Sequence, residues 1–192
     1  MLFIIQIKIR YNFKKKDNIL KKLVLPFIAG FMITNSFAED KTTLAGDILQ
    51  ILIPSVAYGT TLYLDDKEGQ MEFYKSFATN EAITYGLKYS VDKKRPNGGD
   101  HSFPSGHTSA SFQGATFIHK RYGLKYAIPA YMAATFVGYS RVDARAHYTI
   151  DVAAGALIGS LSSYYFTTKY KGFKIQPVAN LSGYGIEVST KW

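Results

Sequence analysis

Residues 140–151 read SRVDARAHYTID, and the rest of the chain is organised around this stretch. It places Ser140 and Arg141 ahead of His147, and Asp151 four residues after the histidine. If His147 lies at a helix start, the four-residue step puts its ring and the Asp151 carboxylate on one helix face. A carboxylate there can keep one ring nitrogen protonated and leave the other free to attack an electrophile. Taken alone, the same residues are also typical of an ordinary polar helix end.

Two more polar clusters lie upstream, between apolar segments. In the first, Lys88 is followed after six residues by Arg95 and a proline, and the second is PSGH at residues 104–107. Ammonium and guanidinium groups suit phosphate oxygens. A helix that begins near Ser105 presents backbone N–H groups and a positive dipole end to an anion, and Gly106 lets that backbone come close to a ligand.

The chain carries two histidines within these clusters, His107 and His147. One imidazole can attack phosphorus while the other protonates a leaving oxygen. Of the other two histidines, His119 is interpreted as a cation at a helix end and His101 as a loop residue at the rim of the site.

The three clusters together read Lys-x6-Arg-Pro, Pro-Ser-Gly-His and Ser-Arg-x5-His-x3-Asp. This pattern resembles the signature of the type 2 phosphatidic acid phosphatase superfamily, which also includes bacterial class A acid phosphatases and vanadium haloperoxidases. Every fixed position of the signature is met, and the resemblance covers about residues 44–166. It implies an all-α helical bundle with the active site at one end.

The resemblance also implies a role for each motif residue. His147 would be the nucleophile that forms a phosphohistidine, Asp151 would orient it, and His107 would be the general acid and then the base. The residues implied to bind phosphate are Lys88, Arg95, Ser105, Gly106 and Arg141. Ser140 is expected to support Arg141, and no metal or other cofactor is implied because fixed cations and backbone donors stabilise the charge.

The function that we expect is hydrolysis of a phosphomonoester or diphosphate, and a lipid phosphate on the periplasmic side of the envelope is the first candidate. The alternatives are a soluble periplasmic acid phosphatase, a vanadium-dependent haloperoxidase, and a phosphate- or lipid-binding protein without activity. The motifs do not decide which substrate is hydrolysed. The candidates are phosphatidate, phosphatidylglycerol phosphate, undecaprenyl diphosphate and the phosphates of lipid A. A membrane surface is an expected partner and nucleic acid is not.

The spacing of apolar residues predicts about five core helices, at 42–64, 71–89, 105–119, 124–139 and 149–165. A polar connector with a glycine, residues 65–70, separates the first two. In the second helix we expect Ile83 to point inward and Glu72 outward. Gly155 and Gly159 have the spacing that lets two helices approach closely.

The first 38 residues read as a secretory signal peptide, with a basic region, an apolar run at 23–33 and a small-x-small cleavage site that ends at Ala38. Translation is expected to begin at Leu20 rather than at the first methionine. These 38 residues carry seven Lys or Arg and one acid, so they account for +6 of the net charge of +9 and leave an ordinary +3. The predicted phosphatase domain is 39–174, followed by an extended tail at 175–192.

Overall fold

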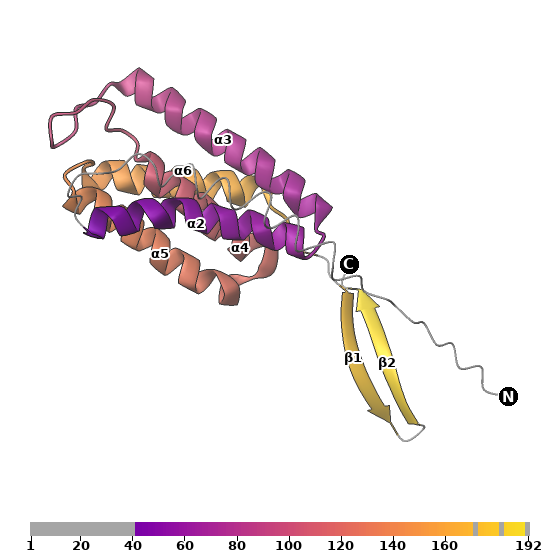
Figure 1. Ribbon diagram of the computed structural model, residues 1–192. Coiled ribbons are helices and arrows are strands. Elements are labelled where there is room, and N and C mark those ends of the chain that lie inside the picture. Colours follow the sequence, from indigo (N-terminus) through magenta and orange to yellow (C-terminus); the bar gives the residue numbers. More distant parts are fainter. Residues whose placement is uncertain (1–40, 171–172, 181–182, 191–192) are drawn as a thin grey trace. The chain divides into compact units, whose positions relative to one another are not determined.

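The computed structural model describes residues 41–170, 173–180 and 183–190, so the predicted signal peptide at 1–38 lies outside the described residues. Within them the chain forms five helices and then two strands (Figure 1). The helices are α2 (Lys41–Tyr63), α3 (Lys67–Val91), α4 (Gly106–Tyr122), α5 (Leu124–Asp143) and α6 (Thr149–Phe166). The prediction of an all-α bundle of about five core helices is confirmed.

Two helix boundaries differ from the prediction by four residues, and the second of them lies at the site. α3 begins at Lys67 rather than at Met71, because Asp66 caps it by accepting a hydrogen bond from the backbone N–H of Gly69 at 2.9 Å. α5 continues to Asp143, so Arg141 lies in its last turn and not ahead of the next helix. The connector that follows α5 is correspondingly short.

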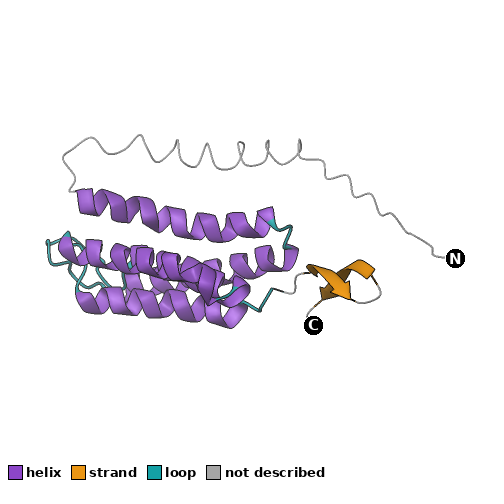
Figure 2. Cartoon of the chain, turned by 90° about the horizontal axis from the view of Figure 1, so that it is seen from below, coloured by secondary structure: helices purple, strands orange, loops and turns teal. Residues whose placement is uncertain are grey.

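Helix α4 is the centre of the bundle, since it packs against each of the other four helices. The helices lie side by side in both views (Figures 1 and 2). Gly155 and Gly159 of α6 allow its backbone to touch that of α4: a Cβ atom added at Gly159 would lie 2.1 Å from the carbonyl oxygen of Ser109, and one at Gly155 would lie 2.4 Å from that of Ser105. The close approach predicted for these two glycines is confirmed.

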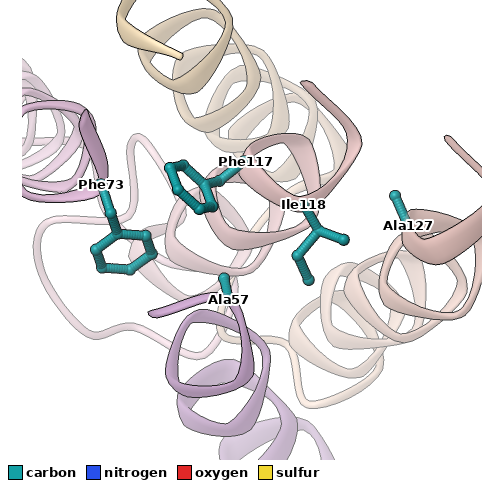
Figure 3. Close-up of a cluster of buried hydrophobic side chains, with 5 residues drawn as sticks. All are labelled: Ala57, Phe73, Phe117, Ile118 and Ala127. Atoms are coloured by element: carbon teal, nitrogen blue, oxygen red, sulfur yellow. The ribbon is translucent and has the colours of Figure 1, made fainter. Parts of the chain in front are cut away.

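The apolar core is small and lies around α4. Figure 3 shows one cluster, to which four helices contribute. The rings of Phe73 and Phe117 meet edge to face, with their centroids 5.2 Å apart. The cluster consists of Ala57, Phe73, Phe117, Ile118 and Ala127. A second apolar cluster consists of Ile53, Ala115, Ala134 and Val137.

Much of the remaining interior is polar, which the sequence pattern did not predict. Gln113 Nε2 donates to Ser76 Oγ at 2.9 Å, and the hydroxyls of Thr84 and Ser109 are 3.0 Å apart. Such bonds link α3 to α4 and satisfy groups that would be costly to bury alone.

The expected orientation of α3 was wrong at two positions. Glu72, expected outside, is buried and accepts a hydrogen bond from Arg121 Nη1 at 3.1 Å. Ile83, expected inside, is 42% exposed. The pattern failed because the buried face of α3 carries polar side chains that bond across the bundle, while apolar side chains lie outside.

The C-terminal segment forms a two-stranded antiparallel hairpin, β1 (Phe173–Asn180) and β2 (Gly183–Thr190), with Phe173 opposite Thr190. The extended character predicted for this segment is confirmed, and β1 begins two residues ahead of the predicted boundary at 175. Among the described residues, none of the helices has the length and apolar character required to cross a membrane.

The contact between α4 and α6 predicts the outcome of a glycine substitution. Gly159→Ala should lower the unfolding free energy by about 1–3 kcal/mol, because the added methyl collides with the α4 backbone. Thermal unfolding followed by circular dichroism measures the change. Gly59→Ala on α2 is the matched control: nothing lies within 4 Å of its added Cβ, and alanine favours a helix by about 1 kcal/mol. Equal melting temperatures for the two variants would contradict the tight contact.

Candidate active site

The motif residues meet at one end of the bundle, where α3 and α5 end and α2, α4 and α6 begin (left in Figure 1). Side-chain contacts join these helix ends. Asp47 of α2 contacts Arg141 of α5, and the ring of His147 contacts the loop before α4. The alternating direction of successive helices thus brings together residues far apart in sequence.

His147 lies in the turn between α5 and α6 and is only 3% exposed. Its Nδ1 is 2.7 Å from the carbonyl oxygen of Ser102. Because a carbonyl can only accept, Nδ1 carries the proton in the neutral ring and Nε2 keeps its lone pair. Burial, together with the positive charges of Arg95 and Lys88, lowers the pKa of His147 to about 4, although the Ser102 carbonyl and Asp151 oppose this shift. The imidazole is therefore neutral near pH 7.

Asp151 is fully buried in the first turn of α6, and its contacts differ from the direct pairing with His147 that the four-residue step suggested. One carboxylate oxygen accepts from Lys93 Nζ at 2.7 Å, and the other accepts from Ser102 Oγ at 2.5 Å and from the backbone N–H of Tyr148 at 3.0 Å. Ser102 therefore stands between the carboxylate and the imidazole. The expected geometry fails because α6 begins at Thr149, two residues after the histidine.

The charge of Asp151 is maintained by these donors. Burial alone raises the pKa of its carboxyl, but hydrogen bonds from Lys93, Ser102 and Tyr148 lower it below the usual value. The carboxylate of Asp151 and the imidazole of His147 share Ser102 as a hydrogen-bonding partner, and the negative charge of Asp151 acts to raise the pKa of His147.

The positive charges of Lys88 and Arg95 both act to lower the pKa of His147, and the charge of Arg95 also lowers the pKa of Lys88. Lys88 Nζ donates to the carbonyl oxygens of His101 and Pro104, both at 2.9 Å. An ammonium group has three donors, so one remains for a ligand. Burial, followed by the charge of Arg95, lowers the pKa of Lys88. These two cations give the site the positive character that a phosphate needs.

Ser105 and Gly106 occupy the start of α4, as predicted, but they differ in what they can offer a ligand. Ser105 is the N-cap residue: its backbone N–H donates to the carbonyl of Asp151 at 2.9 Å, and its hydroxyl oxygen accepts from the backbone N–H of Thr108 at 3.4 Å. Both hydrogen bonds of Ser105 therefore hold the start of α4 in place. Gly106 has room for a Cβ, with Thr84 3.9 Å away, so packing within the protein does not demand glycine there.

Arg141 is anchored on three sides. Its Nε donates to Ser140 Oγ at 3.1 Å, its Nη1 to Asp47 at 2.6 Å and its Nη2 to the carbonyl of Thr43 at 2.8 Å. The expected support from Ser140 is therefore present. His107 Nε2 lies 3.0 Å from the same oxygen of Asp47.

Sequence reasoning missed three residues of this site: Asp47, Lys93 and Ser102. Asp47 carried a weak signal, as an acid in the first turns of an otherwise apolar helix. Lys93 and Ser102 lie in the charged loop before α4, where nothing in the spacing separates them from their neighbours. At the rim, His101 Nδ1 lies 3.2 Å from Asp92.

Comparison with known proteins identifies the family of this chain. The family model of the PAP2 superfamily matches residues 76–174. The lipid A 4'-phosphatase of Helicobacter pylori is 29% identical over 166 residues, which are 77% of this chain and 83% of the relative. The lipid A 1-phosphatase of Porphyromonas gingivalis is 30% identical over 173 residues, 79% of this chain but 38% of the relative.

The fold has a solved counterpart. The crystal structure of Aquifex aeolicus LpxE superposes with a TM-score of 0.52 and 23% identity, and the alignment covers 67% of this chain and 87% of that one. This likeness concerns the helical fold. The family match over half of the sequence leads to one conclusion: the chain belongs to the PAP2 superfamily and is a phosphatase of that family.

Proposed function

We propose that this protein hydrolyses the phosphate of a lipid through a phosphohistidine formed on His147, without a metal ion, on the periplasmic side of the inner membrane. The observation that carries the mechanism is the Ser102 carbonyl 2.7 Å from Nδ1 of His147, because it selects the tautomer whose Nε2 can attack. The supporting charges are those of Lys88 and Arg95, which act to lower the pKa of the His147 ring.

In the first step, the Nε2 lone pair of His147 forms a bond to phosphorus. The bond between phosphorus and the leaving oxygen breaks, and its electron pair goes to that oxygen, which takes a proton from His107. The imidazole becomes positive as the phosphohistidine forms. Asp151 stabilises this charge through Ser102, whose hydroxyl donates to the carboxylate and whose carbonyl oxygen accepts a hydrogen bond from Nδ1–H of His147.

In the second step, water attacks phosphorus and His107 accepts its proton. The bond between phosphorus and nitrogen breaks, its electron pair returns to Nε2, and inorganic phosphate leaves. The charge on the phosphoryl oxygens is balanced throughout by Lys88, Arg95 and Arg141 and by N–H groups of the first turn of α4 that begins at Gly106. Because these cations are part of the chain, we infer that the reaction proceeds in the presence of a chelator.

A lipid substrate is supported by the outer surface of the helices. On α2, Leu44, Ile48, Leu52 and Val56 follow one another at four-residue steps and are 42–51% exposed. On α5, Ile128, Met132 and Phe136 repeat the pattern. Exposed apolar stripes of this kind mark surfaces that bind a membrane or another protein. Since two relatives are lipid A phosphatases, phosphorylated lipid A is the first substrate to test.

The central experiment is a phosphate-release panel with the full chain in mild detergent. Phosphorylated lipid A, phosphatidate, undecaprenyl diphosphate and 4-nitrophenyl phosphate are compared with and without chelator. We expect the highest kcat/KM on a lipid phosphate, unchanged by chelator. His147→Asn should lower it by roughly 10³-fold or more, because the nucleophile is lost.

The matched control for that variant is His119→Asn, an exposed histidine far along α4. It should keep wild-type activity. Activity retained in His147→Asn would exclude the phosphohistidine, and a preference for 4-nitrophenyl phosphate over every lipid would favour the soluble acid phosphatase instead.

The low pKa of His147 predicts how stability depends on pH. Between pH 4 and 6.5 the unfolded chain binds a proton at this position and the folded chain does not, so stability falls as the pH falls through this window. From pH 7 to pH 4.5, wild type should therefore lose on the order of 2 kcal/mol more unfolding free energy than His147→Asn. Urea unfolding at the two pH values measures the difference. Parallel losses in the two proteins would show that His147 is not held neutral.

A further inference from the structure

Asp47 lies outside the three sequence motifs, yet it contacts two of them. It belongs to the second turn of α2, and its Oδ1 atom is 2.6 Å from Nη1 of Arg141 and 3.0 Å from Nε2 of His107. A single oxygen thus joins the arginine at the end of α5 to the histidine at the start of α4. The side chain of Asp47 is 15% exposed and that of Arg141 is 6% exposed, so their contact is shielded from bulk water, whereas the His107 side chain is 36% exposed.

The packing of α2 against α5 fixes this position. Gly46 is buried, and a Cβ atom there would lie 2.1 Å from Ser140 Oγ and 2.7 Å from Nη2 of Arg141. Glycine therefore allows the α2 backbone to reach the guanidinium, where the carbonyl of Thr43 accepts a further hydrogen bond at 2.8 Å. The carboxylate next to Gly46 has little freedom to take another partner.

The contacts of Arg141 leave two of its N–H donors for a ligand. A guanidinium has five N–H donors, and three of them are engaged by Ser140, Asp47 and Thr43. The remaining two can bind a phosphoryl group in a plane set by the three anchors. Burial raises the pKa of Asp47, but hydrogen bonds and charge from His107 and Arg141 lower it below the usual value, so the carboxylate is ionised near pH 7.

We propose that Asp47 is a positioning residue that holds the phosphate-binding Arg141 and the general acid His107 in one fixed arrangement. The inference rests on the proposed function, since it assigns Asp47 a part in that same reaction. Asp47 touches neither phosphorus nor the leaving oxygen; it acts through the guanidinium and the imidazole. Its loss should weaken anion binding through Arg141 and proton transfer through His107 together.

The two effects can be measured separately. Asp47→Asn is compared with wild type on short-chain phosphatidate, whose alkoxide must be protonated as it leaves, and on 4-nitrophenyl phosphate, whose phenolate leaves without a proton. We expect kcat/KM to fall roughly 10- to 100-fold more on phosphatidate than on the aryl ester, because only the former needs the acid. The inhibition constant of vanadate, which reports the phosphate-binding groups including Arg141, should rise several-fold on both substrates.

Three controls separate positioning from folding. Asp47→Glu keeps the charge and should recover part of the phosphatidate activity. Asp143→Asn makes the same chemical change at an exposed acid two residues after Arg141, and it should match wild type. Thermal unfolding of each variant shows whether it is folded. If a variant is folded but has no turnover, its vanadate affinity measured by calorimetry still tests anion binding.

Other outcomes overturn the inference. An equal loss on both substrates with an unchanged vanadate constant would mean that Asp47 acts only on stability. Wild-type rates in Asp47→Asn would remove Asp47 from the reaction and leave the proposed function intact. A wild-type chain that releases phosphate from neither ester and from no other lipid of the panel, phosphorylated lipid A included, would instead reject the proposed function, and the inference with it.

Discussion

The backbone contact between α4 and α6 is the constraint on which the rest of the site depends. Gly155 and Gly159 bring the α6 backbone against the carbonyl oxygens of Ser105 and Ser109. At the top of this contact the backbone N–H of Ser105 donates to the carbonyl of Asp151 at 2.9 Å. The start of one helix is thereby tied to the start of the other, which holds the two motif histidines, His107 and His147, at a fixed separation. A looser contact would leave their relative positions to the connecting loops.

Ionised side chains are tolerated at this end of the bundle because each has a partner. One chain of contacts runs from Lys93 through Asp151 and Ser102 to His147. The other runs from His107 through Asp47 to Arg141. An unpaired buried charge would cost several kcal/mol. Since each carboxylate serves more than one donor, the site keeps its cations in place while some of their N–H groups remain for a phosphoryl group.

The sequence alone predicted the five helices, because apolar residues repeat at helical spacing. The motif residues lie at helix ends and in loops, and the structure gathers these at one end of the bundle. Two things were out of reach. Asp47 lies 94 residues from Arg141, so no local pattern reports their contact. The relation between His147 and Asp151 passes through Ser102 in the loop before α4, and the spacing within residues 140–151 cannot report that contact.

The inward face of α3 was mispredicted because apolar side chains were assumed to point inward. In this bundle, hydroxyl and amide groups such as those of Thr84 and Gln113 bond across the interior, and apolar stripes lie outside.

The most direct test of the proposed phosphohistidine is acid-free rapid-quench trapping of the enzyme during turnover, with the modified peptide located by mass spectrometry. A phosphoryl group on His147, absent from His107, is the predicted result. Turnover with no phosphorylated intermediate, or with the label on another residue, would contradict it.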